Sequence, residues 1–188
     1  MIIKIKKIAC IFIASFVFLG SANAQTDDQI ADFAKAAKFN DVATVKSLIT
    51  KGVSPNATDP KGEPMLNLAI KEQSEDVTFL LITNKATDVD LSNKYGETPL
   101  MIASIGGNLP VVKALIQQRN AKIDHIGWTP LHYACAKGQL QVAQYLVANG
   151  AIIDSMSTGN TTPLMMAVQS GNEELIKLLL DKGADIRL

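Results

Sequence analysis

The sequence contains little of what marks several common classes of protein. Only two of its 188 residues are cysteine, 5% are aromatic and 19% are charged. Cys10 lies in an N-terminal segment that we expect to be removed, which leaves Cys135 as the single cysteine of the mature chain. An internal disulfide is then excluded, so the packing of side chains has to hold the fold together.

The sequence also lacks a large excess of positive or of negative charge. The whole chain has 18 basic and 18 acidic residues, and a mature chain of residues 25–188 has 15 basic against 18 acidic residues, a net charge of −3. Because nucleic-acid-binding proteins concentrate Lys and Arg on one face, we expect no nucleic-acid partner. Beyond residue 24 no apolar stretch is long enough to span a bilayer, so we expect no stable membrane insertion of the mature chain.

Residues 1–24 have the three parts of a secretory signal peptide. Lysines near the start are followed by the apolar residues 8–19, and the ending Ala22-Asn23-Ala24 predicts cleavage before Gln25. An apolar run of this length is too short for a permanent membrane anchor. A short Lys-rich signal of this form is typical of bacteria, so we expect the product in the periplasm, with secretion as the alternative.

The strongest signal is an internal repeat. Residues 98–103 read Thr-Pro-Leu-Met-Ile-Ala, residues 129–134 and 162–167 follow the same pattern, and degenerate copies lie at 64–69 and 33–36. Each copy ends in alanine, and successive alanines are 33, 34, 31 and 33 residues apart: Ala36, Ala69, Ala103, Ala134 and Ala167. A period of this length indicates stacked copies of one unit that cannot bury its apolar face alone.

Each unit predicts two helices and a loop. Threonine suits the N-cap of a helix and proline its first turn, so the Thr-Pro pairs predict the start of a short helix. Eight, nine, twelve and thirteen residues after each alanine, 18 of 20 positions are apolar, a spacing that lines one face of a second helix. Gly52, Gly150 and Gly183 follow where a helix needs a left-handed C-terminal residue, whereas the other two copies have Lys85 and Arg119.

The period and the segment Thr129-Pro130-Leu131-His132-Tyr133-Ala134 resemble the ankyrin-repeat family. The resemblance implies an all-α fold, an ankyrin-repeat solenoid of about five helix-turn-helix repeats with extended finger loops. The domain would span residues 25–188, with repeats at approximately 27–58, 59–92, 93–124, 125–156 and 157–188.

Two departures from the regular period predict local features of the stack. The second and third finger loops differ in length from the others, so we expect an irregular stack there. Charged residues between positions 173 and 182 predict a hydrated face at the C-terminal end, as a terminal repeat requires.

Residues able to carry catalysis or to bind a metal are few. Asp124, His125 and His132 match no known ligand spacing, and the resemblance implies a structural role for His132 in the ankyrin turn. Cys135 is expected to be a small buried side chain, because His132 is the only base near it in the sequence. We therefore predict no enzymatic activity, no cofactor and no metal, and keep a metal or small-ligand carrier as an alternative.

The resemblance implies that a partner binds along the finger tips and the exposed side of the first helices, which together form a concave surface. Among the residues expected there, aromatic and apolar side chains would form the hot spot. For Trp128 the alternative is that the ring packs along its own finger. The predicted partner-binding residues are Lys61, Lys94, Tyr95, Ile105, His125, Ile126, Trp128 and Lys137.

The sequence therefore predicts a monomeric, non-enzymatic protein–protein interaction module in the bacterial periplasm, with a protein partner that the sequence does not identify. Similarity to small exported bacterial ankyrin proteins implies an accessory role for an oxidant-handling enzyme. An immunity-type inhibitor of a toxic enzyme is the alternative within the same class.

Overall fold

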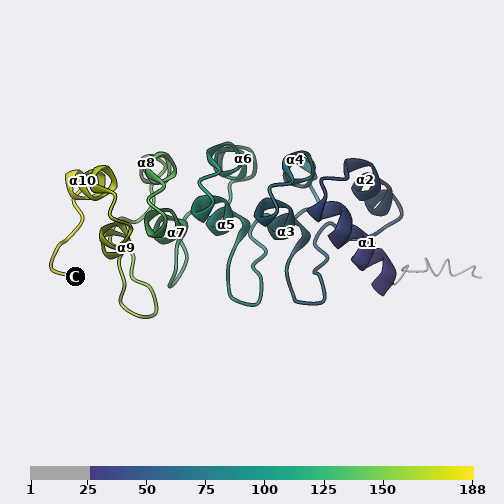
Figure 1. Cartoon of the computed structure of the whole chain (residues 1–188), viewed down its shortest axis with the longest axis horizontal. Coiled ribbons are helices and arrows are strands. Elements are labelled where there is room, and N and C mark those ends of the chain that lie inside the picture. The colour runs from purple at the N-terminus through teal and green to yellow at the C-terminus, as the bar shows by residue number, and fades with distance from the viewer. Residues whose placement is uncertain (1–25) are drawn as a thin grey trace, which may run out of the picture.

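The structure, a computed structural model, describes residues 26–188. The predicted signal peptide, residues 1–24, lies outside the described residues. Within residues 26–188, ten helices follow one another in five antiparallel pairs (Figure 1). The pairs are α1 (Asp27–Lys38) with α2 (Val42–Thr50), α3 (Met65–Lys71) with α4 (Glu75–Thr83), α5 (Pro99–Ile105) with α6 (Leu109–Arg119), α7 (Pro130–Ala136) with α8 (Leu140–Ala148), and α9 (Pro163–Ser170) with α10 (Glu173–Asp181).

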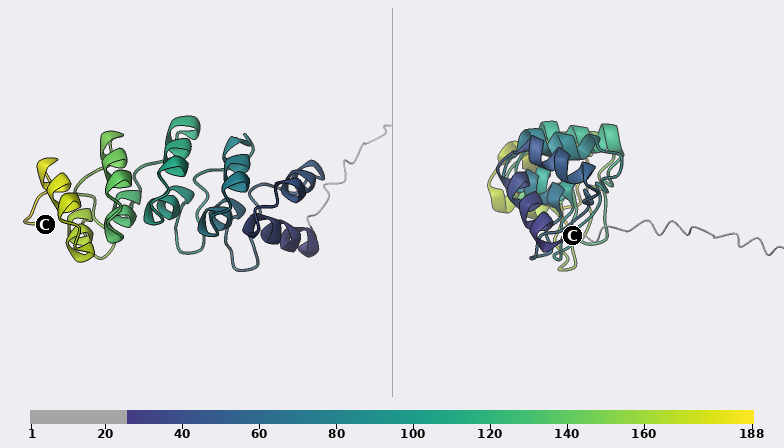
Figure 2. Two further views of the ribbon diagram at one scale, coloured as in Figure 1. Left: turned by 45° about the horizontal axis from the view of Figure 1, so that its top comes forward. Right: turned by 90° about the vertical axis from the view of Figure 1, so that its right-hand side faces the viewer.

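The pairs stack side by side into two rows. The first helix of each pair forms the inner row, the second forms the outer row, and the connecting loops project beyond the inner row as fingers (Figures 1 and 2). The rows bend gently, with the outer helices on the convex side (Figure 1). The predicted all-α ankyrin solenoid is confirmed, and one helix pair lies within each of the five predicted repeats.

The helix starts follow from the capping residues. Thr98 Oγ1 accepts a hydrogen bond of 3.3 Å from the backbone N–H of Met101, and Thr162 does the same for Met165. The first repeat lacks the Thr-Pro pair, and there Thr26 caps α1 together with the Gln29 side chain, which completes a capping box. These bonds satisfy N–H groups that have no partner within the helix.

The core runs through the stack between the two rows. Ala69, Ala103, Ala134 and Ala167 are fully buried, and their small side chains let neighbouring inner helices approach closely. Fully buried leucines at the same position of the outer helices fill the space behind them: Leu81, Leu115, Leu146 and Leu179. Burying one such leucine contributes about 1.5–3 kcal/mol, so the apolar positions of the period provide most of the stabilisation.

Glycine ends three of the outer helices as predicted. Gly52, Gly150 and Gly183 have φ angles of +92°, +94° and +91°, which side chains with a Cβ rarely adopt. In the third repeat, α6 continues through Arg119 and ends at Asn120, whose φ is +53°. The short finger at 120–129 that follows, beside the longer one at 84–98, is the irregularity that the repeat spacing predicts.

Arg119 has a second role that joins two repeats. Its guanidinium donates hydrogen bonds to the backbone carbonyls of Ile82, Asn84 and Thr87, the last two at 2.9 and 2.7 Å. All three carbonyls lie at or just beyond the end of α4, in the other repeat that lacks the glycine. The arginine therefore satisfies acceptors at the start of the preceding finger.

A ladder of hydrogen bonds also links the bases of the fingers. In four repeats, an Asn or Asp side chain accepts a bond from a backbone N–H of the next repeat, at 2.7–3.1 Å. We call these four acceptors the acceptor ladder: Asn56, Asp90, Asp124 and Asp154. The corresponding position of the fifth repeat is Arg187, which has no acceptor atom.

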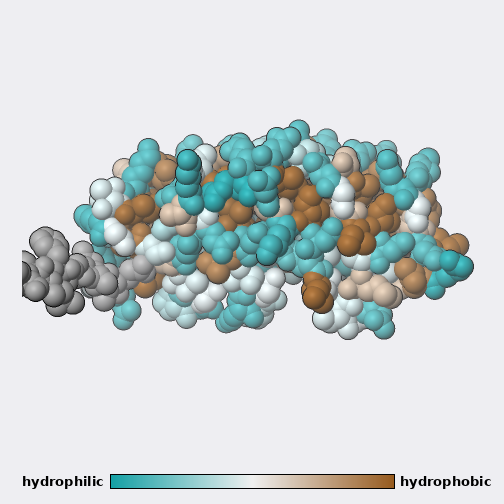
Figure 3. All heavy atoms as spheres, turned by 180° about the vertical axis from the view of Figure 1, so that it is seen from behind, coloured by the Kyte–Doolittle hydropathy of each residue, from teal (hydrophilic) through white to brown (hydrophobic). Residues whose placement is uncertain are grey.

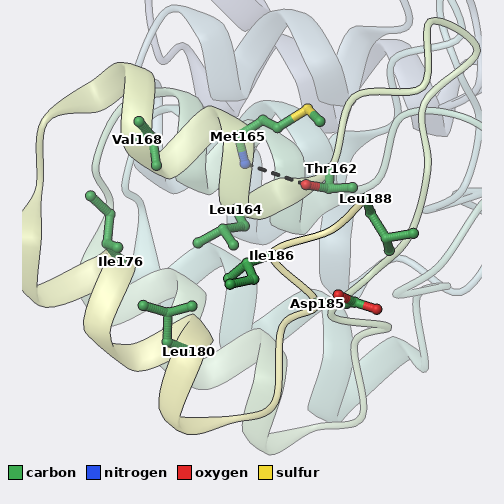
Figure 4. Close-up of a pocket in the computed structure, with 9 residues that line it drawn as sticks. All are labelled: Thr162, Leu164, Met165, Val168, Ile176, Leu180, Asp185, Ile186 and Leu188. Carbon is green, nitrogen blue, oxygen red and sulfur yellow. Dashed lines mark hydrogen bonds between the residues drawn. The ribbon is translucent and has the colours of Figure 1, made fainter.

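The C-terminal end of the stack corrects the expectation of a hydrated face. Charged side chains lie along α10, but the surface between α9, α10 and residues 185–188 is an apolar hollow of about 410 Å³ (Figure 4). The prediction was wrong here because it considered α10 alone, whereas α9 and residues 185–188 also contribute apolar side chains to this surface.

Candidate protein-binding surface

Two predicted hot-spot residues stand far out on the fingers. Tyr95 is 74% exposed, and the fully exposed Ile126 is in the short finger between α6 and α7. Lys94 Nζ lies 5.1 Å from the centre of the Tyr95 ring, a cation–π contact. Lys61 is exposed on the preceding finger, so it and Lys94 occupy neighbouring loops.

His125 is less accessible than its predicted place at a finger tip implies. The ring is half-buried, and its Nε2 lies 3.2 Å from the carbonyl oxygen of Lys122 in the same finger.

The inner helices contribute a hollow of about 250 Å³, which we call the aromatic hollow. Its lining residues are Ile105, Trp128, His132, Tyr133, Ala136 and Met166. The Trp128 ring is 39% exposed and meets His132 and Tyr133 edge-on, with centroid distances of 5.3 and 6.3 Å. Both interpretations of Trp128 therefore hold, because one side of the ring packs and the other remains open to solvent.

A network of polar side chains from three repeats borders the aromatic hollow. Lys71 Nζ lies 2.6 Å from Glu63 and 3.4 Å from Glu97, and Asn93 donates to Glu97 at 2.7 Å. The Tyr133 hydroxyl donates to the other oxygen of Glu97 at 3.3 Å. We call these five residues the polar network. It connects the base of two fingers to the wall of the aromatic hollow.

The polar network shifts the pKa values of its members. Burial raises the pKa of Tyr133 to about 12, and the charge of Glu97 adds to that shift. For Glu97, burial acts to raise the pKa, but hydrogen bonds from Asn93 and Lys71 and the charge of Lys71 outweigh it and lower the pKa. For Lys71, burial opposes the two carboxylates, which prevail and raise the pKa. Glu97 and Lys71 are therefore held in their charged forms, and Tyr133 as a neutral hydrogen-bond donor.

Tyr133, Met166 and Glu97 were not among the residues predicted from the sequence. Tyr133 and Met166 stand one position before the repeat alanine, on the side of the inner helix that faces the fingers. Aligning the repeats on their alanines and comparing that position would have found them. Of the predicted residues, only Ile105 and Trp128 meet in the aromatic hollow, while Lys137 is exposed at the end of α7.

The residues considered for catalysis or metal binding have structural roles. His132 Nδ1 accepts the backbone N–H of Thr129 at 3.2 Å, so Nε2 carries the proton and donates to the carbonyl of Thr161 at 2.9 Å. The Cys135 thiol is completely buried, which raises its pKa to about 12 and keeps it protonated. Asp124 belongs to the acceptor ladder.

Residues 26–188 contain neither a cluster of metal-ligating side chains nor a helix able to span a membrane. No three His, Cys, Asp or Glu side chains in this part of the chain are placed to hold a metal ion together. Among the described helices, none combines the length and the apolar character that crossing a bilayer needs.

Comparison with known proteins agrees with this architecture. A family model described as ankyrin repeats, three copies, matches residues 33–126 and 120–188. The chain belongs to the ankyrin-repeat family. Ankyrin repeats generally mediate protein–protein interaction and are typically non-enzymatic, which makes the finger side of the stack the natural place to look for a partner.

Several larger ankyrin-repeat proteins are similar to this chain. Human transient receptor potential cation channel subfamily A member 1 is 29% identical over 161 residues, which are 80% of this chain and 14% of that protein. Human neurogenic locus notch homolog protein 1 is 30% identical over 160 residues, 82% of this chain and 6% of that protein. Palmitoyltransferase AKR1 of Lachancea kluyveri is 34% identical over 122 residues, 62% and 16% respectively. The chain thus spans a small part of each relative's length.

Proposed function

We propose that this protein is a non-enzymatic binding module of the bacterial periplasm that holds a protein partner against the finger side of its ankyrin stack. The observation that carries the proposal is the aromatic hollow, an apolar depression walled by Trp128 and Tyr133 on the finger side of the stack. Tryptophan and tyrosine are enriched among the residues that provide most of the energy of protein interfaces.

The aromatic hollow suits one apolar side chain of a partner. Trp128 is fixed by its edge-on contacts and Tyr133 by its hydrogen bond to Glu97, so little side-chain entropy is lost when the partner binds. Tyr95 and Ile126 add exposed contacts on the adjacent fingers. The contact area would then extend from the fingers to the inner helices, as a partner that lies across several repeats requires.

The charges around this surface favour a partner with an acidic rim. Lys61, Lys94 and Lys137 are exposed on the fingers and at the end of α7, whereas the carboxylates of Glu63 and Glu97 already face Lys71. Exposed charges of one sign mainly speed the encounter with an oppositely charged partner and contribute less to affinity.

Two parts of the proposal, the periplasmic location and the class of the partner, are supported by the sequence alone. The signal-peptide pattern of residues 1–24 supports export, and the resemblance to small exported bacterial ankyrin proteins supports an oxidant-handling enzyme as the partner. Cell fractionation tests the first point. The expected result is protein in the periplasmic fraction that begins at Gln25, and uncleaved protein in the cytoplasm would contradict it.

Affinity purification from crosslinked periplasm tests the binding site. The bait is the chain from Gln25, which includes every described residue, with a C-terminal tag. The site variant Tyr95→Ala/Ile105→Ala/Ile126→Ala is compared with Ile152→Ala, which removes an exposed apolar side chain just after α8. We expect one dominant partner, retained by the control and reduced at least tenfold in the site variant.

Both variants must keep the circular dichroism spectrum of the parent chain. A partner bound equally by the site variant and the control would show that binding uses another surface. Mass spectrometry of the retained protein decides whether it is an oxidant-handling enzyme.

A further inference from the structure

The C-terminal end of the stack presents an unusual apolar surface. Its exposed side chains converge from α9, α10 and the residues after α10 (Figure 4). We call this surface the end face and define it by Met165, Val168, Leu180, Ile186 and Leu188, which are 38%, 58%, 43%, 77% and 45% exposed. Seen from behind, apolar atoms reach this end of the molecule and hydrophilic groups flank them (Figure 3).

In the third and fourth repeats, the repeat that follows covers the positions that correspond to Met165 and Val168. Val168 follows the repeat alanine, as Cys135 and Ser104 do, and both of those side chains are completely buried. Met165 corresponds to His132, which is also completely buried. The fifth repeat therefore exposes apolar side chains where the fourth is covered, whereas a terminal repeat usually has a polar outer face.

Another ankyrin repeat in the same register is a poor occupant of the end face. The acceptor ladder would need an Asn or Asp at position 187, but Arg187 stands there and pairs with Asp185 of its own repeat at 2.7 Å. A further repeat would therefore lack this polar link.

The opposite end of another copy is a poor occupant too. The surface of the first repeat beside Phe39 includes the charged side chains of Asp32, Lys35 and Asp41. Covering these groups with the apolar end face would remove them from water without offering partners, which is unfavourable.

We propose that the end face binds the end face of a second copy of this chain, forming a two-fold symmetric dimer joined at the fifth repeats. The rim supports self-association because Lys177 pairs with Asp181 at 2.5 Å and Arg187 with Asp185 at 2.7 Å. Each of these pairs is neutral, so neither adds a net charge to a contact between two copies. In a two-fold contact the same patch serves both subunits, and apolar surface covers apolar surface.

The expected dimer is weak and leaves the binding surface free. One helix pair offers a small contact, below about 1,200 Å² in total, and interfaces of that size belong to transient complexes. We therefore expect a dissociation constant on the order of 10 µM. The aromatic hollow lies in the third to fifth repeats on the finger side, so dimerisation would present two such surfaces on one particle.

Analytical ultracentrifugation of the chain from Gln25, over a range of concentrations around the expected dissociation constant, tests the proposal. Ile186→Asp places a charge in the centre of the end face, and Phe39→Asp is the matched control because Phe39 is 75% exposed at the other end of the stack. We expect the parent chain and Phe39→Asp to dimerise alike, and Ile186→Asp to raise the dissociation constant at least tenfold with an unchanged circular dichroism spectrum.

A second variant tests the symmetry. Ile186→Cys should form an intermolecular disulfide on mild oxidation, since the two copies of residue 186 face each other, whereas Phe39→Cys should not. Cys135 is buried and does not interfere. A parent chain that stays monomeric, a dimer unaffected by Ile186→Asp, or equal loss of the dimer in Phe39→Asp would each overturn the proposal.

Discussion

Removing the guanidinium of Arg119 should loosen the contact between the second and third repeats. In the native structure this group donates to three carbonyls of the preceding repeat, those of Ile82, Asn84 and Thr87. Arg119→Ala leaves all three without these donors while it keeps the helix propensity of α6. The loss should therefore concern the contact between the repeats and not the helix itself.

The magnitude follows from the number and environment of these bonds. A hydrogen bond to a charged group contributes about 1.5–3 kcal/mol when buried, and Arg119 is only half-buried, so we take about 1 kcal/mol for each of the three carbonyls. Arg119→Ala should then lower the free energy of unfolding by about 3 kcal/mol. For a domain of this size, that corresponds to a decrease in melting temperature of about 6–12 °C. Arg119→Lys should lower the free energy of unfolding by less than Arg119→Ala does, because an ammonium group can bind some of the three carbonyls but lacks the planar fork that reaches all of them.

Two measurements locate the effect. Urea unfolding followed by circular dichroism gives the total loss, and amide hydrogen exchange shows where the structure opens. We expect faster exchange in the finger at 84–98 and unchanged exchange in the finger at 149–162. Arg187→Ala, measured at low protein concentration, is the control, because Arg187 is exposed and binds only Asp185 of its own repeat.

The reasoning is refuted if Arg119→Ala is as stable as the Arg187→Ala control. It is equally refuted if exchange accelerates in both fingers alike, because the arginine would then act on the whole stack and not on one contact.

Three further predictions concern a buried thiol, a buried imidazole and two glycines with positive φ. The Cys135 thiol, with its pKa raised to about 12 by burial, should react with a thiol reagent at pH 8 only after unfolding. Burial lowers the pKa of His132 below its ordinary 6.5, so the unfolded chain binds the proton more readily. Stability should therefore fall as the pH decreases through and below 6.5, and His132→Asn should weaken this dependence in urea titrations. Gly107→Ala should cost about 2 kcal/mol, against about 1 kcal/mol for Gly150→Ala. Both glycines have positive φ, but only at Gly107 would the new methyl group clash with the side-chain amide of Gln139, which donates a hydrogen bond to the carbonyl of Ile105.

Each of these predictions has a clear opposite. Rapid labelling of Cys135 in the native protein would mean that the fourth repeat opens readily. Equal pH dependence in His132→Asn would assign the titration to other groups. Equal costs at the two glycines would show that the Gln139 side chain moves aside without losing its hydrogen bond to the carbonyl of Ile105.

The sequence by itself determined what each repeat contains. The spacing of the alanines and of the apolar positions predicted five helix pairs, since these features depend on residues within one repeat. The left-handed glycines also followed from positions within one unit, and the structure confirms them. Local preferences and periodicity are sufficient for these features because each involves neighbours in the chain. The structural role expected for His132 came from the resemblance to the ankyrin family, and it involves both Thr129 of the same turn and Thr161 of the next finger.

Only the tertiary structure decided what lies between the repeats. The Arg119 contacts join residues 32 to 37 positions apart, and the contact of Tyr133 with Glu97 joins residues 36 apart. The end face arises from two helices and the residues after them. Such contacts depend on how far one repeat is turned against the next and on loops of unequal length, neither of which periodicity specifies. The period therefore predicted the stack, whereas the surfaces on which a partner or a second copy would bind could be identified only from the tertiary structure.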